Sequence, residues 1–280
     1  MDKFGIDISR YQGKPDFAKV KDSVSFVILQ AGFGRYANQV DAEFERNYKE
    51  CKKYNIPIGA YWFSYAASPA EAKEEANACI EVLKGKQFEY PIYYDIENSA
   101  CSGDVPGKCR AFCDTLENAG YYAGVYISRS PAEQYIKNTD VVKKYTLWLA
   151  EYPTLHYNGA VDMWQNSSTG NISGINCAVD TDHCYQNFPE IIKRGGFNGY
   201  PKNPQTLDDI GYKYKDFGTG VYLLKAILRN CYKRNLNGDD VFGQGTQNAV
   251  NSILAAHGYI ENGIAGNGFA ELISKELERK

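Results

Sequence analysis

The sequence predicts an α/β protein in which a closed barrel of eight strands is followed by a small, mainly helical domain. Through the first 190 or so residues, short apolar runs alternate with segments of helical periodicity, which is the pattern of strand–helix units around a parallel sheet. Eight such runs occur, and eight is the number that closes a parallel barrel. A stretch rich in Gly and Pro then separates them from about 70 residues that contain helical patterns only.

The expected strands are the apolar runs, taken in order along the chain. They lie at 4–8, 26–31, 58–63, 92–96, 122–127, 145–150, 161–165 and 177–180. Helical spacing appears between the earlier strands, at 42–54, 69–83, 106–119 and 131–136. The last three strands occupy only the 36 residues from 145 to 180, which leaves no room for full helices between them. We therefore expect an irregular TIM-like barrel of the form (β/α)5(β)3.

Two of the expected helices begin with the same four residues, Ser-Pro-Ala-Glu. Ser68 and Ser130 would be the N-caps, with Pro at the first helical position and Glu71 or Glu133 three residues after the cap. This is a capping box with the preferred first residue, so it predicts where both helices start.

The chain is expected to divide into two domains. The barrel would occupy residues 1–195, a linker residues 196–210 and a small module residues 211–280. The segment 195–204 contains two Pro and three Gly, which suits a linker. Beyond it, helical patterns cover 221–234 and 246–257.

The composition excludes several classes of protein. Hydrophobic residues make up 44% of the 280, which is enough for a sizeable core. The net charge of −3 and the lack of a basic run argue against nucleic-acid binding. No apolar run is long enough to cross a bilayer, and residues 1–9 lack the apolar core of a signal peptide. We therefore expect synthesis in a cytoplasm, no membrane partner, and any export by another route.

Cysteine and histidine are not arranged as metal ligands. The eight Cys are expected to be free thiols, since a cytoplasm keeps them reduced. Three of them cluster at 101, 109 and 113, but without a CxxC pair or a nearby His. The three His, at 156, 183 and 257, are scattered. We expect no metal site and no cofactor.

Two acidic residues close the most informative apolar run, Tyr90–Glu97. Asp95 and Glu97 are two residues apart, so on a strand both side chains project from one face, with Cα atoms about 6.6 Å apart. Like charges held this close raise one pKa, which is what an acid and an anionic stabiliser need at a glycosidic bond. Taken alone, Asp-x-Glu fits two solvated charges better, because the tripeptide is common.

Acidic residues also lie on two other expected strands. In barrels of this type the C-terminal ends of the strands carry the site. Asp7 lies on the first strand and Asp180 ends the eighth, and these strands are neighbours in a closed barrel. Four carboxylates around one mouth repel each other, which a purely structural role does not explain. Together they indicate a glycosidase site.

Seven segments of the first 190 or so residues resemble, in family order, the motifs of the family 25 glycoside hydrolases, the Chalaropsis-type lysozymes. They are Gly5–Gly13, Gly59–Phe63, Pro91–Glu97, Tyr122–Tyr126, Leu147–Ala150, Met163–Gln165 and Val179–Asp180. The resemblance implies an irregular βα barrel that cleaves the β-1,4 bond between N-acetylmuramic acid and N-acetylglucosamine in bacterial peptidoglycan. It also implies Glu97 as general acid and Asp95 as its partner, with Asp7 and Asp180 completing the acidic site.

The implied chemistry sets requirements for these residues. Glu97 must hold a proton near neutral pH, so we expect partial burial and an Asp95 anion to raise its pKa. An ionised Asp95 would stabilise oxocarbenium-like charge or orient the substrate's N-acetyl group as nucleophile, and both routes stay open. The family motif on the eighth strand usually reads Asp-x-Asn, whereas this chain has Asp180-Thr-Asp182. From motif position we expect Asp180 to point inward.

Aromatic residues are the expected substrate contacts. Tyr61, Tyr126 and Trp164 lie at or near expected strand ends. Their rings would stack on the apolar faces of sugars, and packing in the core is the alternative for each.

The C-terminal module resembles a peptidoglycan-binding domain family with a three-helix fold. The matching segments are Gly220–Leu228, Asp240–Val250 and Asn262–Phe269. The chain departs from that family at Ser252–Leu254, where a Phe-Gln pair is usual, and at Asp240, where Gly is usual. The implied role is wall binding, and the alternatives are packing on the barrel or self-association through the module.

A catalytic barrel, a wall-binding module and no signal peptide together resemble a phage endolysin. Such an enzyme stays in the host bacterial cytoplasm until it is released to the cell wall, and a non-secreted bacterial autolysin has the same pattern. Two other functions stay open. A chitinase-like glycosidase would need an Asp where this chain has Tyr93, and a non-catalytic wall-binding protein would need a broken acidic set.

Overall fold

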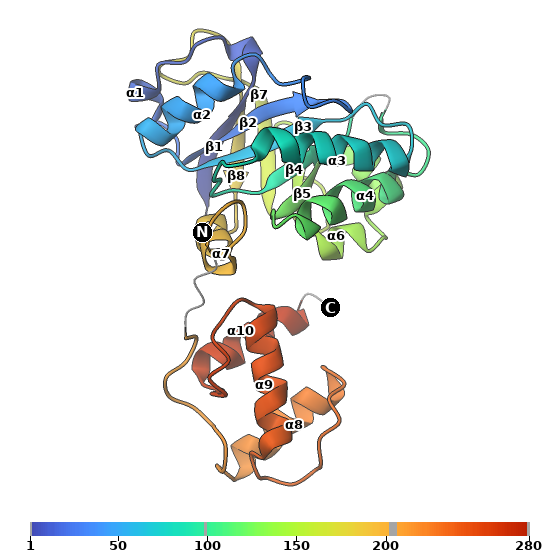
Figure 1. Cartoon of the computed structure of the whole chain (residues 1–280), viewed down its shortest axis with the longest axis vertical. Helices are drawn as coiled ribbons and strands as arrows, with labels where there is room; N and C mark the ends of the chain where they lie inside the picture. Colours follow the sequence, from blue (N-terminus) through green and yellow to red (C-terminus); the bar gives the residue numbers. More distant parts are fainter. Residues whose placement is uncertain (1, 98–99, 202–205, 279–280) are drawn as a thin grey trace. The chain divides into compact units, whose positions relative to one another are not determined.

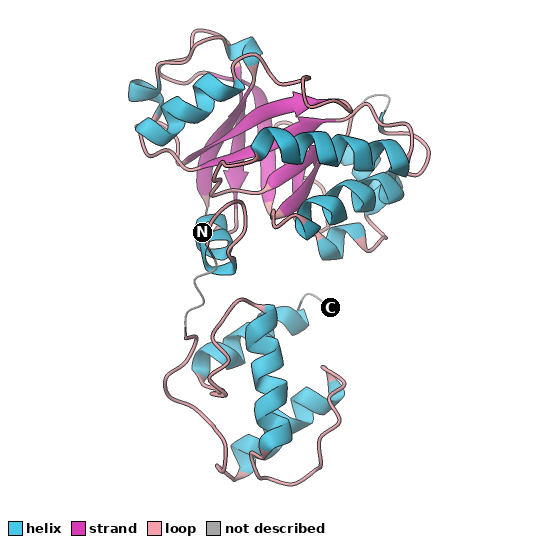
Figure 2. Cartoon of the chain, viewed as in Figure 1, coloured by secondary structure: helices cyan, strands magenta, loops and turns pink. Residues whose placement is uncertain are grey.

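A computed structural model describes residues 2–97, 100–201 and 206–278 of the chain. The chain forms two compact units, which divide between Pro201 and Lys202. The first unit holds all the strands drawn in Figure 2, and the second is helical. This arrangement confirms the predicted fold class, an α/β barrel followed by a small, mainly helical domain.

Eight strands close the barrel in sequence order, and each pairs with the next (Figure 1). They are β1 (Lys3–Ile8), β2 (Phe26–Phe33), β3 (Ile58–Phe63), β4 (Ile92–Asp95), β5 (Ala123–Ser128), β6 (Thr146–Ala150), β7 (Met163–Gly170) and β8 (Val179–Cys184). All eight were expected from apolar runs. The largest differences are in the last two strands, which begin two residues later than predicted and extend further, because β7 and β8 pair with each other along their length.

The direction of the last strand differs from the prediction. Strands β1 to β7 run parallel, whereas β8 is antiparallel to both β1 and β7. A parallel return needs a crossover of about a dozen residues or more, usually through a helix. Only residues 171–178 separate β7 from β8, and they form no helix, so the chain turns back on itself. As a result the start of β8, not its end, lies level with the ends of the other strands.

Helices cover the outside of the barrel between the early strands. They are α1 (Phe17–Val20), α2 (Phe44–Lys53), α3 (Pro69–Leu83), α4 (Val105–Asn118), α5 (Arg129–Pro131), the π-type segment η3 (Ala132–Ile136) and α6 (Val141–Lys144), and a 3-10 turn, η1, covers Arg10–Gln12. The expected cap of α3 is present, because Ser68 Oγ accepts a hydrogen bond from Glu71 N at 3.3 Å. The expected cap at Ser130 is wrong. Helix α5 starts directly after β5, with Ser128 in extended conformation before it, so Ser130 lies inside the helix.

The barrel unit has two apolar layers. One lies between the strands and the outer helices and includes Phe44, Leu83 and Phe112. The other fills the barrel interior, and α7 (Phe188–Gly195) joins it through Phe188 and Ile192. Helix α7 lies at the end of the barrel near the N-terminus (Figure 1). Helix α7 therefore closes this end, the floor of the barrel.

The residues expected to form the linker, 196–210, are divided between the two units. Residues 196–201 belong to the barrel unit, and residues 206–210 belong to the second unit. Asn198 is fully buried, in the left-handed region at φ +52°, and it contacts two strand starts. Its Oδ1 accepts from Tyr122 N at 2.8 Å, and its Nδ2 donates to Tyr90 O at 2.8 Å. Between the two units, residues 202–205 lie outside the described part of the chain.

The second unit contains α8 (Thr219–Asn230), α9 (Gln244–Ala256) and α10 (Asn267–Glu278) around a small core with Leu228, Phe242 and Val250. Helical periodicity predicted the first two helices, and it missed α10. Asp208 determines where α10 begins, because its carboxylate accepts from the backbone N–H groups of Gly268 at 2.9 Å and Phe269 at 2.8 Å. In the described residues, no helix has both the length and the apolar character needed to cross a bilayer.

We predict that Asn198→Ala destabilises the barrel unit by about 2–4 kcal/mol, because it removes the two hydrogen bonds that the buried Asn198 amide makes to Tyr122 N and Tyr90 O. Chemical denaturation of a chain ending at residue 201 measures this change. Asn198→Gly tolerates the left-handed backbone but also lacks the amide, so it should lose nearly as much stability. Asn158→Ala, at an exposed position, is the control. A loss below 1 kcal/mol in both Asn198 variants would contradict this role.

Candidate active site

A cavity of about 320 Å³ opens at the end of the barrel where β1 to β7 finish. Along a strand every second side chain shares a face, so inward-facing residues at the strand ends line this cavity. The lining residues are Asp7, Ser9, Tyr11, Gln30, Tyr61, Phe63, Asp95, Glu97, Tyr126, Trp148, Tyr152, Gln165 and Asp180. The structure thus brings together all four acids that the sequence singled out, with Tyr61 and Tyr126.

The backbone of β4 holds the first pair of acids firmly. Asp95 O accepts from Ser64 N at 2.9 Å, and Ile96 N donates to Tyr126 O at 3.0 Å, so this segment is fixed by both neighbouring strands. Asp95 is only 4% exposed, and Glu97 next to it is half-buried. The Glu97 carboxyl lies close enough for its charge to act on the Asp95 carboxyl.

Burial raises the pKa values of both carboxyls of this pair. It raises the pKa of Asp95 well above its usual value, and the charge of Glu97 raises it further. The pKa of Glu97 is raised by its partial burial, as expected, while its interaction with Asp95 lowers it. Burial also disfavours the ionised form that was expected of Asp95.

The second group of acids forms where β1 meets β8. Asp7 lies directly opposite Asp180 in the antiparallel register, as expected from the closure of the barrel. Asp180 stands at the start of β8, however, and not at the end of a parallel strand. Asp182 lies two residues further along the same face, so both point inward, with Asp182 deeper and fully buried. Asp182, which stands where the family motif usually has Asn, is therefore inside the barrel.

Burial dominates the electrostatics of this group too. It raises the pKa of Asp7 well above normal, and the charges of Asp182 and Asp180 add to the effect. The Asp182 pKa is raised by burial as well, although Asp182 Oδ1 accepts from Trp148 Nε1 at 2.8 Å. Within the described residues, Asp182 Oδ2 has no hydrogen-bond partner. Burial and mutual repulsion thus both favour the protonated forms of these carboxyls.

Gln165 joins the acids to the tyrosines of the mouth, and the sequence analysis did not single it out. Its Nε2 donates to Asp7 Oδ2 at 2.7 Å, and its Oε1 accepts from Tyr126 Oη at 2.8 Å and from Tyr152 Oη. The amide therefore orients the Asp7 carboxyl from one side. Strict alternation from Met163, which is buried inside the barrel, would have placed Gln165 inward.

Of the three aromatic residues expected to contact the substrate, two lie in the cavity. Tyr61 and Tyr126 line the cavity, whereas Trp164 lies on the outer face of β7. Trp164 Nε1 donates to Glu151 O at 2.8 Å, and its ring stacks on His183 at 5.7 Å. Trp164 directly precedes the inward-facing Gln165, so period-two geometry turns it away. Trp148 stands in the cavity instead, with its ring 4.5 Å from that of Tyr126.

Comparison with known proteins assigns the family. The sequence profile of the family described as "Glycosyl hydrolases family 25" matches residues 6–175, which is more than half of the chain. The chain belongs to this family.

Three relatives show how far the likeness extends. The modular autolysin LytC of Streptococcus pneumoniae, solved in complex with a synthetic peptidoglycan ligand, is 30% identical with a TM-score of 0.60; the match covers 66% of this chain and 47% of that one. The CTP1L endolysin is 23% identical with a TM-score of 0.64 over 85% of each chain, a likeness in fold. The Escherichia coli K12 protein YegX is 24% identical over 192 residues, which is 63% of this chain and 67% of YegX. This family 25 chain thus spans about half the length of LytC.

In this family 25 barrel, a buried lysine forms hydrogen bonds with both the loop that follows β3 and the loop that follows β4. Lys108 of α4 is fully buried, and its ammonium donates to three backbone carbonyls. They belong to Ala66 at 3.1 Å, to Ala100, and to Ser102 at 2.9 Å. The first follows β3, and the other two follow β4 shortly after Glu97. The ammonium therefore fixes both loops relative to the helix layer.

The acids are not grouped as metal ligands. In the residues that the structure describes, no three His, Cys, Asp or Glu side chains are arranged to hold a metal ion. Independence from metal ions and cofactors remains a prediction.

We predict that Asp182→Asn stabilises the protein more at pH 8 than at pH 5. A group whose pKa is raised on folding binds its proton more tightly in the folded state, so stability falls as pH rises through that pKa. Asn does not titrate, and it can still accept from Trp148. The expected gain in Tm at pH 8 is about 2–4 °C, the shift produced by about 1 kcal/mol in a domain of this size. Asp22→Asn, an exposed substitution, is the control. An equal effect at both pH values would argue against buried-acid repulsion.

Proposed function

We propose that this chain is an endolysin-type N-acetylmuramidase, which hydrolyses the β-1,4 bond between N-acetylmuramic acid and N-acetylglucosamine in bacterial peptidoglycan. The observation that carries the proposal is the pair of carboxyl groups, Asp95 and Glu97, that line a cavity with a closed floor. Membership of family 25 and the likeness to an autolysin solved with a peptidoglycan ligand support it. Glu97 is the general acid, and Asp95 is the stabilising carboxylate.

The pKa values suggest how the two acids divide their roles. Burial raises the pKa of both carboxyls, so a proton on one of them is retained nearer neutral pH. As the glycosidic bond lengthens, positive charge develops on the sugar, and a neighbouring carboxylate is then stabilised in its ionised form. Asp95 is therefore the ionised member of the pair, and Glu97 donates its proton to the leaving oxygen. Asp95 either attacks the anomeric carbon or orients the substrate's N-acetyl group to do so, and water completes the hydrolysis with Glu97 as base.

The remaining residues hold the sugar and the charge in place. Gln165 keeps the Asp7 carboxyl aimed at the cavity, and Asp180 stands opposite Asp7 at the same edge. Tyr61 and Tyr126 contribute ring faces beside Trp148, which suit the apolar face of a pyranose. The pKa values of both tyrosines are raised by burial, so each keeps its hydroxyl proton as a donor.

The two alternative functions have less support. A chitinase-like site would place a third acid at position 93, but Tyr93 is fully buried inside the barrel and its ring packs 5.1 Å from that of Trp148. A non-catalytic wall-binding barrel would have lost some of its acids, whereas all four line one cavity.

We predict that Glu97→Gln lowers turnover of purified peptidoglycan at least ~10²-fold, because the amide cannot donate a proton to the leaving oxygen. Asp95→Asn should also cripple turnover, because it removes the anion. Glu81→Gln, at an exposed position on α3, is the matched control. Mass spectrometry of the released fragments should show reducing muramic-acid ends. Reducing glucosamine ends would make the enzyme a glucosaminidase, and near-normal turnover in Glu97→Gln would refute the acid assignment.

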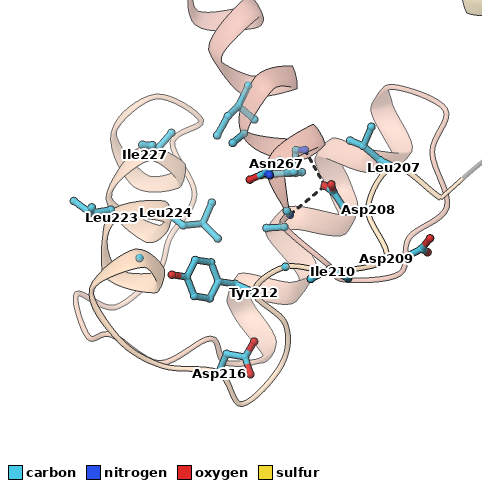
Figure 3. A pocket seen from close by; sticks show the side chains of 17 residues that line it. Leu207, Asp208, Asp209, Ile210, Tyr212, Asp216, Leu223, Leu224, Ile227 and Asn267 are labelled. Atoms are coloured by element: carbon cyan, nitrogen blue, oxygen red, sulfur yellow. Dashed lines mark hydrogen bonds between the residues drawn. The ribbon is translucent and has the colours of Figure 1, made fainter.

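We also propose that the second unit binds the cell wall. It contains an open pocket of about 950 Å³, lined mainly by apolar side chains of α8, α10 and the segment before α8 (Figure 3). Leu223 and Tyr212 line it and are 57% and 42% exposed, whereas Leu228 of the same helix is fully buried in the core. An exposed apolar hollow of this size on a small domain is typical of a binding surface. Self-association through the same surface is the alternative.

We predict that Leu223→Asp weakens co-sedimentation of the full chain with cell walls about tenfold. The substitution is made in the Glu97→Gln background, so that the walls stay intact. Leu223 is exposed, so the fold should tolerate the charge, while an apolar contact with the wall would be lost. Ile260→Asp, an exposed apolar position outside the pocket, is the control. Equal sedimentation of all these chains would refute the targeting role, and a change in oligomeric state instead would favour self-association.

A further inference from the structure

A second hollow lies beside the catalytic cavity, between the loops that follow β2 and β3. It has a volume of about 250 Å³ and is lined by Gly34, Arg35, Tyr36, Gln39, Tyr65 and Glu71. Tyr36 is 62% exposed and Tyr65 is 58% exposed, so neither ring is part of the core. Nothing in the proposed chemistry uses these residues. Two exposed tyrosines in one hollow at the edge of an active site suggest a ligand contact.

Aromatic side chains connect this hollow to the catalytic cavity. Phe63, at the end of β3, lines the cavity, and its ring centroid is 5.1 Å from that of Tyr65. Phe33, at the end of β2, contacts Tyr65 from another direction at 6.2 Å. A chain that leaves the cavity over Phe63 therefore reaches Tyr65 next. The 320 Å³ of the cavity is at the small end for a ligand site, so most of a polymeric substrate must lie outside it.

The loop that carries Tyr65 is fixed by hydrogen bonds to side chains of α3 and α4. Tyr65 N donates to Glu75 Oε1 at 2.7 Å, and Glu75 is a fully buried carboxyl of α3. Ser64 Oγ donates to the other oxygen of Glu75 at 2.8 Å, and Ala66 O accepts from the buried Lys108. Two buried ionisable groups thus fix three successive residues. A ring on such a loop loses little freedom when it binds, which favours affinity.

The facing loop is fixed as well. Gly34 N donates to Phe63 O at 3.1 Å, and Gly34 O accepts from Trp62 Nε1 at 2.8 Å. The side chain of Gln39 accepts from Tyr36 N at 3.0 Å, which closes the loop on itself. Gly34 has φ +69°, a conformation that favours glycine at this turn. The hollow is therefore preorganised between two braced loops.

The polar groups of the hollow suit a neutral, hydroxyl-rich ligand. Arg35 is paired with Glu71 at 3.2 Å and with Glu74 at 3.6 Å, so its charge is largely balanced. The amide of Gln39 and the tyrosine hydroxyls add further hydrogen-bonding groups. Ring faces beside balanced polar groups match a pyranose, which has apolar faces and a hydroxyl rim.

We propose that this hollow, centred on Tyr36 and Tyr65, is an outer saccharide subsite that binds a further sugar of the glycan strand whose scissile bond lies in the catalytic cavity. The inference rests on the proposed glycosidase function, and it adds that the affinity of the enzyme depends on the length of the strand. Strands long enough to reach the hollow bind more tightly than strands that fill the cavity alone.

The test compares kcat/KM on peptidoglycan-derived glycan strands of two defined lengths, one short and one several disaccharides longer. The wild-type chain should prefer the long strand. Tyr65→Ala should lower the ratio of long to short about fivefold, and Tyr36→Ala with Tyr65→Ala about tenfold. Tyr65→Phe keeps the ring and should restore most of the ratio. Tyr185→Ala, an exposed tyrosine just beyond the C-terminal end of the antiparallel β8, is the matched control.

A second measurement distinguishes a failure of the subsite proposal from a failure of the proposed glycosidase function. The dissociation constant of the long strand for the Glu97→Gln chain, measured by calorimetry, should rise by about the same factors when Tyr65→Ala is added. If the wild-type chain cleaves both strands, but neither the ratio nor the dissociation constant changes in the Tyr36 and Tyr65 variants, the subsite is wrong and the glycosidase stands. If the wild-type chain cleaves neither strand and Glu97→Gln binds neither, both proposals fall.

Discussion

The barrel unit depends on keeping several carboxyl groups buried at the mouth of a barrel whose floor is closed. Asp7, Asp95 and Asp182 are almost fully buried, and burial raises the pKa of each. An uncompensated buried charge destabilises a protein by several kcal/mol, so protonation and directed hydrogen bonds both stabilise these groups. Gln165 and Trp148 supply two of these bonds. The same strain makes the site reactive, since an acid held near its neutral form can donate a proton at neutral pH.

The architecture serves this constraint at each level. Apolar side chains fill the barrel below the acids, and α7 closes the floor, so water reaches the carboxyls from one side only. The antiparallel turn of β8 brings Asp180 and Asp182 beside Asp7, which supplies acids from the start of one strand and from the end of its neighbour. Behind the mouth, Lys108 and Glu75 brace the loops from the helix layer. Rigid loops then hold the rings that a sugar would contact.

Much of this organisation follows from local sequence. All eight strands and the starts of α3 and α4 could be predicted, because apolar runs and capping residues act over a few neighbours. The acids could be predicted as a group, because the ends of barrel strands meet at one edge. Gln165 and Trp148 were missed, although alternation along β7 and β6 places them inward. Trp164 was chosen by residue type, and an error of one position puts a side chain on the opposite face.

The sequence by itself determined the strand–helix order, the acidic set at Asp7, Asp95, Glu97 and Asp180, and the family, because each depends on residues within short segments of the chain. Only the tertiary structure decided the direction of β8, the inward position of Asp182, the place of Asn198 in the barrel unit and the burial that raises the pKa of Asp95. These features depend on which groups are brought close and how much water they lose. Burial and proximity are properties of the packed chain, so no local pattern encodes them.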